Sequence, residues 1–138
     1  MKLYSSVISL VAFFSVASAV KIQYDTVYDN SEASLSSVTC SDGANGLLTK
    51  GYTTFGSLPS FPHVSAAKAV GGWNSKACGS CWRITYQGKS VNVTAIDTAG
   101  DGFNPSLETL NTLTNGHGVE FGHIDAQAVQ IDKKYCGL

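Results

Sequence analysis

The chain has 138 residues, with nine Lys and Arg against ten Asp and Glu, which gives a formal net charge of −1 at pH 7. No basic cluster exceeds Lys133-Lys134, so the composition excludes the positive patch that nucleic-acid binding needs. A chain of this length can bury one hydrophobic core but is too short for two, which predicts a single domain.

The first 19 residues have the pattern of a secretory signal. Lys2 supplies a positive charge, residues 3–16 are uncharged and mostly apolar, and Ala17-Ser18-Ala19 places small residues where a signal peptidase cleaves. We therefore predict a signal peptide over 1–19 and an exported domain over 20–138. The apolar run is shorter than the ~20 residues that a spanning helix needs, so no membrane span is expected.

Four segments alternate apolar and polar residues in the manner of half-buried strands: 21–24, 81–86, 90–97 and 128–133. The second and third segments are separated by the turn-forming Gln87-Gly88-Lys89 and are expected to form a hairpin. Its second strand should bury one face, made of Val91, Val93 and Ala95. In the last strand, Val129 and Ile131 are expected to point inward.

Two helices are expected between these strands, a short one over 63–70 and a longer one after residue 103. In the longer helix, Asn104 is the predicted N-cap, Pro105 takes the first helical position, and Asn115-Gly116 ends the helix. Its apolar stripe, Leu107, Leu110 and Leu113, is expected to pack on the core. Many short strands with few helices indicate a small β-barrel.

The four cysteines are Cys40, Cys78, Cys81 and Cys136. The Cys78–Cys81 spacing fits half a zinc site, a thiol redox motif or a meeting point of two disulfides. Cys40 and Cys136 stand alone, and an even number of cysteines in a small exported chain indicates a disulfide framework. We therefore expect two disulfides, with no metal and no cofactor.

The pairing of the cysteines stays open on the residues alone. A Cys78–Cys81 bridge would close a very small loop and add little stability. Cys40–Cys78 with Cys81–Cys136, or Cys40–Cys81 with Cys78–Cys136, would each close loops of several dozen residues. The chain-entropy model gives roughly 4 kcal/mol per bridge in either pairing.

A set of short motifs spans the chain from residue 20 onward: Tyr24-Asp25, Cys40-Ser41-Asp42-Gly43, Gly46-Leu47, Phe61-Pro62, Gly72-Trp73, Cys78-Gly79-Ser80-Cys81-Trp82, Asp97, Gly102-Phe103-Asn104 and Cys136. In identity and order these motifs resemble the cerato-platanins, small secreted fungal proteins related in fold to barwin and to the first domain of expansins. The resemblance implies a mainly β fold, a six-stranded double-psi β-barrel with short surface helices. It also implies the pairing Cys40–Cys78 and Cys81–Cys136.

The function implied by the resemblance is non-catalytic carbohydrate binding outside the cell or at the cell wall. Its ligands would be chitin oligomers of N-acetylglucosamine or cell-wall polysaccharide, with expansin-like loosening that involves no hydrolysis. The resemblance further implies a role as an elicitor recognised by a host receptor. We expect a monomer that can self-assemble at interfaces.

Three residues are predicted to bind the carbohydrate. Asp97 ends a strand before the glycine-rich loop 98–102, a common place for functional polar groups, and Asn104 lies just beyond that loop. The resemblance places both in the family's binding groove, together with Tyr24. Each also has a purely structural explanation, as a turn hydrogen bond, a helix cap and a packing residue. At the end of a strand, Asp97 is expected to support little of the core.

Two alternative functions and one modification are also considered. A glycoside hydrolase would use Asp97 as the acid, but no spacing selects its second carboxyl group among Asp101, Asp25, Glu120 and Asp125. A surface-active coat protein would use exposed aromatic residues from the set Tyr52, Phe55, Trp73 and Phe103, although Trp73 is expected to be half-buried near Cys78. Finally, Asn92-Val93-Thr94 is an N-glycosylation sequon inside a predicted strand.

Overall fold

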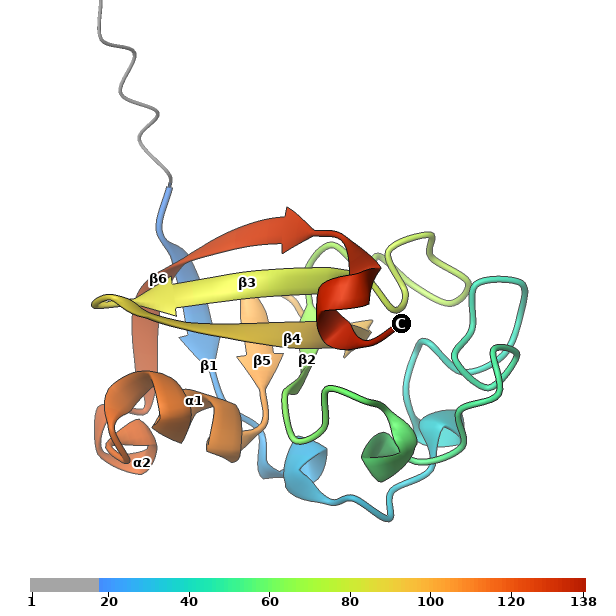
Figure 1. Cartoon of the computed structure of the whole chain (residues 1–138), viewed down its shortest axis with the longest axis horizontal. Coiled ribbons are helices and arrows are strands. Elements are labelled where there is room, and N and C mark those ends of the chain that lie inside the picture. Colours follow the sequence, from blue (N-terminus) through green and yellow to red (C-terminus); the bar gives the residue numbers. More distant parts are fainter. Residues whose placement is uncertain (1–17) are drawn as a thin grey trace, which may run out of the picture.

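The computed structural model describes residues 18–138, so all but the last two residues of the predicted signal peptide lie outside the described part. The described chain forms a closed barrel of six strands in the order β1-β5-β2-β4-β3-β6 (Figure 1). The β1–β5 and β2–β4 pairs run parallel, and the other four pairs run antiparallel. The strands are β1 (Val20–Gln23), β2 (Val64–Ala67), β3 (Cys81–Tyr86), β4 (Lys89–Thr98), β5 (Phe103–Pro105) and β6 (His123–Ile131). The six-stranded barrel is thereby confirmed.

The β3–β4 hairpin forms where the sequence predicts it. Its turn places Gln87 and Gly88 at φ 46° and 81°, the left-handed geometry of two-residue hairpin turns. Pairing starts at Tyr86 and Lys89 and continues to Cys81 and Thr94. The predicted inward face of β4 is confirmed, since all three of its residues are buried: Val91, Val93 and Ala95.

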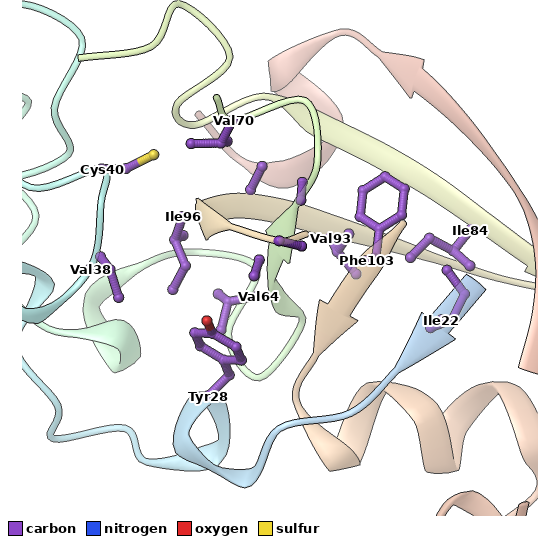
Figure 2. Close-up of a cluster of buried hydrophobic side chains, with 14 of the residues drawn as sticks. Ile22, Tyr28, Val38, Cys40, Val64, Val70, Ile84, Val93, Ile96 and Phe103 are labelled. Carbon is purple, nitrogen blue, oxygen red and sulfur yellow. The ribbon is translucent and has the colours of Figure 1, made fainter. Parts of the chain in front are cut away.

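The long loops beside the barrel extend its hydrophobic core. Figure 1 shows residues 30–63 and 70–80 gathered beyond one end of the barrel. Figure 2 shows Ile84 and Val93 of the barrel and Val38 and Val70 of the loops in one cluster of buried side chains. The 3₁₀ helix η1 (Thr26–Asp29) precedes the longer of these loops, and two more, η2 (Leu35–Ser37) and η3 (Phe55–Ser57), lie within it.

The disulfides join Cys40 to Cys78 and Cys81 to Cys136, which confirms the pairing that the resemblance implies. Cys78 and Cys81 bond different partners. The first bridge ties the long loop to the segment before β3, and the second ties the C-terminal helix η4 (Lys133–Cys136) to the start of β3. With sequence separations of 38 and 55 between the bonded cysteines, the chain-entropy model gives about 4 kcal/mol for each bridge.

The helix predicted over 63–70 is wrong, because this segment contains β2. All four residues of β2 are buried, and the strand lies between β4 and β5 in the barrel. A short run of small buried residues fits a helix and a strand equally well by periodicity. Tertiary pairing on both edges decides in favour of the strand here.

The longer helix is α1 (Leu107–Thr114), and its N-cap is Ser106 rather than Asn104. The Ser106 hydroxyl oxygen accepts a hydrogen bond from the backbone N–H of Thr109. Asn104 and Pro105 instead belong to β5 and pair with β2. The predicted capping role of Asn104 is therefore wrong. The apolar stripe does pack on the core, with Leu110 and Leu113 buried, and a second helix α2 (Gly118–Phe121) follows.

The last strand begins earlier than predicted and buries its other face. β6 starts at His123, and its inward residues are Ile124 and Ala126, whereas the side chain of Val129 is 57% exposed. Pairing of Ile124 with Ile22 of β1 fixes which face of β6 points inward. The predicted inward orientation of Val129 is therefore wrong.

Candidate functional site

Two of the three predicted binding residues lie on either side of one alanine. Ala66 of β2 pairs with Asp97 of β4 on one edge and with Asn104 of β5 on the other. Residues paired directly across strands project from the same face, and neighbouring strands lie about 4.8 Å apart. Asp97 and Asn104 therefore lie roughly 10 Å apart in their backbones, with the small, buried Ala66 between them. We call this the Asp97–Asn104 surface.

A register shift in the barrel produces this arrangement. Between Ser65 and Ala66 the β2–β4 pairing skips a residue, so Ser65 pairs with Ala95 and Ala66 pairs with Asp97. Such a β-bulge changes the direction of side chains locally and is frequent near functional sites. Without the shift, Ala66 would pair with the buried Ile96 in place of Asp97. Sequence alternation alone does not reveal the bulge.

Tyr24 lies next to this surface, directly after β1. Its side chain is half-buried, and the amide of the following residue, Asp25, donates to the carbonyl oxygen of Pro105 at 3.0 Å. This bond joins the chain after β1 to the end of β5, one residue beyond Asn104. Tyr24 and Asn104 thus lie on neighbouring segments of the barrel, in line with the adjacent positions of β1 and β5 (Figure 1).

The Asp97 carboxylate is held by four internal hydrogen bonds. Its Oδ1 accepts the Thr39 amide at 3.0 Å, the Thr39 hydroxyl at 2.6 Å and the Thr98 amide at 2.9 Å. Its Oδ2 accepts the Tyr28 hydroxyl at 2.8 Å. Each carboxylate oxygen offers two lone-pair sites. Three donors share the two sites of Oδ1, whereas Oδ2 has one donor, so one site on Oδ2 remains for another donor. Asp97 is therefore also a structural junction, contrary to the expectation that it supports little of the core.

Tyr28 keeps its proton and acts as a fixed donor to Asp97. Tyr28 is only 6% exposed. Figure 2 shows it within the cluster of buried side chains. Burial, followed by the hydrogen bond to Asp97 and the charge of that carboxylate, raises the pKa of Tyr28 well above its usual range. Sequence reasoning missed both Tyr28 and Thr39, because neither belongs to a spacing pattern and both meet Asp97 only through the fold.

The position of Tyr28 is fixed by two aspartates, one just before η1 and one at its end. Asp25 caps this helix by accepting the Val27 amide at 3.0 Å. Asp29 accepts the first two amides of α1, from Leu107 at 2.8 Å and from Glu108 at 3.0 Å. Tyr28 is thus anchored between β1 and α1. The site has a rigid support, which lowers the ordering cost of binding a ligand.

The carboxyl groups considered as partners of Asp97 in hydrolysis have other positions or roles. Asp25 caps η1, and Glu120 contacts His117 on α2 at 2.8 Å. Asp125 lies on β6 opposite Lys21, and β6 neighbours β1 and β3 rather than β4. Asp101 lies in the β4–β5 loop and lines a separate cavity with Trp82 and Phe103.

The aromatic residues considered for surface activity differ in exposure. Phe55 and Phe103 are buried in the core. Trp73 is 62% exposed, so its predicted half-burial is wrong, and its indole N–H donates to Asp42 Oδ1 at 2.7 Å. This hydrogen bond is the main cause that lowers the pKa of Asp42.

Within residues 18–138, no helix is long and apolar enough to cross a membrane. Within the same described residues, no group of three or more His, Cys, Asp or Glu side chains is placed to hold a metal ion.

Known proteins resemble the chain over nearly its whole length. The family model for Cerato-platanin matches residues 20–138. The "Heat-stable 19 kDa antigen" of Coccidioides immitis is 45% identical over 123 residues, which cover 89% of this chain and 84% of the antigen. The crystal structure of cerato-platanin 3 from M. perniciosa superimposes with a TM-score of 0.84 at 50% identity, covering 87% of this chain and 99% of that one.

Two other solved structures relate the fold to an elicitor and to an expansin. The solution structure of the fungal elicitor Cerato-Platanin has a TM-score of 0.75 at 34% identity, covering 85% of this chain and 96% of that one. A mutant Clavibacter michiganensis expansin, crystallised with cellohexaose, has a TM-score of 0.56 at 18% identity over 83% of this chain and 50% of the expansin. The expansin likeness concerns the fold alone. The family match over residues 20–138 and the sequence identities together show that this chain belongs to the cerato-platanin family of secreted fungal proteins.

Proposed function

We propose that this protein binds a polysaccharide strand, such as a chitin oligomer of N-acetylglucosamine or a cell-wall glycan, and that it does not hydrolyse it. The binding site in this proposal is the Asp97–Asn104 surface together with Tyr24. The observation that carries the proposal is the position of a pre-oriented carboxylate and an amide on either side of the small Ala66.

The chemistry of these side chains suits a sugar. The remaining lone-pair site of Asp97 Oδ2 can accept one hydroxyl or acetamide N–H, and such a charge-assisted bond is worth about 1.5–3 kcal/mol. The Asn104 amide offers both donors and an acceptor. Ala66 is itself covered by protein, so the ligand would contact the partly exposed Asp97 and Asn104 on either side of it, and the half-buried Tyr24 ring offers apolar surface nearby.

The internal bonding of Asp97 supports binding rather than hydrolysis. A glycosidase acid must present a proton to the glycosidic oxygen, and a second carboxyl group must lie about 5–10 Å away. Asp97 instead accepts from four protein donors. A protein that binds one strand in this way competes with hydrogen bonds between strands, which is a physical route to expansin-like loosening. The cellohexaose complex of the structurally similar expansin is consistent with such a ligand.

Recognition by a host is the second part of the proposal. It is supported by the related structure described as a fungal elicitor, which covers nearly the same part of this chain. We propose that the folded protein acts outside the cell as an elicitor or effector. Infiltration of plant leaves with wild-type and Asp97→Asn protein would show whether recognition depends on the Asp97–Asn104 surface.

The test of carbohydrate binding is a parallel titration with chitin, cellulose and xylan oligomers, followed by backbone amide NMR. We expect shifts at Ala66, Asp97 and Asn104 that saturate with one of the three ligands. Asp97→Asn and Asn104→Ala should each weaken that binding about ten-fold, which corresponds to roughly 1.4 kcal/mol. Asp101 is an exposed carboxylate in the loop that follows β4, so Asp101→Asn is the matched control and should bind like the wild type.

Two outcomes would contradict the proposal. Wild-type affinity in folded Asp97→Asn and Asn104→Ala proteins would remove the Asp97–Asn104 surface from the site. Release of reducing ends from polysaccharide by the wild type, and its loss in Asp97→Asn, would show a hydrolase. A surface-active coat protein would instead form films equally well in all three variants.

A further inference from the structure

We propose that Asn92 carries an N-linked glycan whose first sugar lies in the cleft beside Tyr135. Asn92-Val93-Thr94 is a sequon for this modification. The other asparagine followed two residues later by Ser or Thr is Asn104, and the intervening Pro105 blocks transfer there. The inference depends on export of the chain through a eukaryotic secretory pathway, and it is independent of carbohydrate binding at the Asp97–Asn104 surface.

The Asn92 side chain projects away from the barrel interior. It lies on β4 between Val91 and Val93, which are buried at 7% and 0% exposure, and is itself half-buried. Since side chains alternate along a strand, these neighbours point inward and Asn92 points outward. Its partner across the β3–β4 ladder is the exposed Arg83.

The contacts of the Asn92 amide leave its nitrogen available for the modification. Oδ1 accepts from Arg83 Nε at 3.4 Å, an arrangement that persists after glycosylation. Nδ2 donates to the carbonyl oxygen of Tyr135 at 3.5 Å, the long limit of a hydrogen bond. A glycosylated Nδ2 keeps one hydrogen, so attachment of the sugar leaves no buried polar group unpaired.

The space for the first sugar is a cleft of about 610 Å³ that Asn92 and Tyr135 line together. Its size falls in the range of sites for small organic ligands. The Tyr135 side chain is 54% exposed, and Ser90 and the Phe61-Pro62 segment supply polar and apolar surface on the other walls. A sugar with one apolar face and several hydroxyls suits such a mixed lining.

The glycan must be added before the barrel closes. The Thr94 side chain is fully buried, and its hydroxyl contacts the Ser60 hydroxyl at 2.6 Å, so the folded sequon cannot enter an oligosaccharyltransferase. In the nascent chain, Asn92 Nδ2 would attack the anomeric carbon of a lipid-pyrophosphate-linked oligosaccharide. The carbon–nitrogen bond forms, the bond between that carbon and the pyrophosphate oxygen breaks, the lipid pyrophosphate leaves, and the amide loses one proton.

The glycan and the Asp97–Asn104 surface are well separated. Asp97 follows Asn92 by five positions along β4, which corresponds to roughly 16 Å at the usual strand rise. The two sites can therefore be tested separately. Asn92→Gln should remove the glycan and leave oligosaccharide affinity at the Asp97–Asn104 surface unchanged.

The experiment is secretion of the full chain from yeast, followed by intact mass before and after treatment with an N-glycosidase. We expect the mass of the wild type to exceed the mass calculated for residues 20–138 with two disulfides. Treatment should remove the excess mass, and the peptide map should then show aspartate at position 92. Asn92→Gln should show no excess mass. Through-space NMR contacts between the first sugar and the Tyr135 ring should place that sugar in the cleft.

A matched control in the same chain makes a negative result decisive. His117→Thr creates a sequon at the exposed Asn115, in the turn between α1 and α2. A glycan on the double variant Asn92→Gln/His117→Thr would therefore show that the expression host glycosylates this chain. A glycan on that protein together with an unmodified wild-type protein would overturn the proposal. Modification at Asn92 without contacts to Tyr135 would overturn the placement of the sugar in the cleft.

Discussion

Replacing Asp97 by alanine removes a carboxylate that four donors share, and the cost can be worked out from those donors. The Tyr28 hydroxyl is buried and the Thr39 amide is partly buried, so both lose their partner with limited access to water. The Thr39 hydroxyl is also partly buried, whereas the Thr98 amide is exposed and can bond water. An unpaired buried polar group costs about 1–3 kcal/mol. We therefore expect Asp97→Ala to lower the free energy of unfolding by about 2–4 kcal/mol.

Two conservative variants separate the carboxylate's contributions. In Asp97→Asn, the amide oxygen can keep the donors of Oδ1 while the NH₂ group donates to the Tyr28 oxygen, so the expected loss is about 1 kcal/mol. Tyr28→Phe removes one donor and leaves Asp97 with three, with a similar expected loss. The double variant Tyr28→Phe/Asp97→Ala should lose less than the sum of its parts, because it leaves no orphaned Tyr28 hydroxyl.

The assay is equilibrium unfolding in urea, followed by tryptophan fluorescence at constant pH and with the disulfides intact. A small domain has about 5–15 kcal/mol in total, so a loss of 2–4 kcal/mol moves the midpoint clearly. An Asp97→Ala midpoint equal to that of the wild type, or strict additivity in the double variant, would refute the hydrogen-bond argument. The result also decides how binding data on Asp97→Ala are interpreted, since a partly unfolded protein loses affinity for an unrelated reason.

Three further predictions concern the support of the barrel. In Gly102→Ala the new Cβ would clash with the carbonyl oxygen of Lys21, and the residue would keep a left-handed φ of +48°. We therefore expect the free energy of unfolding, measured by thermal unfolding, to fall by about 3 kcal/mol or more. The control Gly100→Ala meets nothing within 4 Å and should be nearly neutral. Asp29→Ala removes both bonds to the first turn of α1 and should lower unfolding free energy by about 1–2 kcal/mol; an unchanged Tm would contradict its capping role. Burial lowers the pKa of His63, and the charge of Glu108 opposes this shift. Because position 63 is therefore protonated more readily in the unfolded chain than in the folded protein, the free energy of unfolding should decrease as the pH falls below about 6.5. His63→Gln should flatten this decline in unfolding measured from pH 7.5 to 5, and an identical slope would exclude His63 as its source.

The hairpin illustrates what local sequence patterns can predict. Gln87-Gly88 supplies the left-handed turn, and Val91 and Val93 alternate with polar residues on a strand with one buried face. Local chemistry and tertiary structure agree there. The disulfide pairing differs, because loop entropy gave two equivalent solutions and only the family resemblance selected the observed one.

The errors arise where tertiary pairing overrides local preference. Asn104-Pro105 has the chemistry of a helix start, but its position between β1 and β2 makes it a strand, and Ser106 takes over the cap. Val129 looks like a core residue, yet the pairing of β6 with β1 turns it outward. The candidate site was predictable in Asp97 and Asn104 only through resemblance. Tyr28 and Thr39 could not be found from the sequence, since long-range contacts alone bring them to Asp97.

The Cys40–Cys78 disulfide makes the geometry of the Asp97–Asn104 surface sensitive to reduction. Thr39, which provides two of the four donors to Asp97, directly precedes Cys40, and the Cys40 amide itself donates to Ile96 at 3.1 Å. Reduction of the Cys40–Cys78 bond would release the segment that positions Thr39, while the other bridge still holds the C-terminus on β3. Reduction of this bridge should therefore loosen Asp97 and weaken the glycan binding that we propose for the Asp97–Asn104 surface.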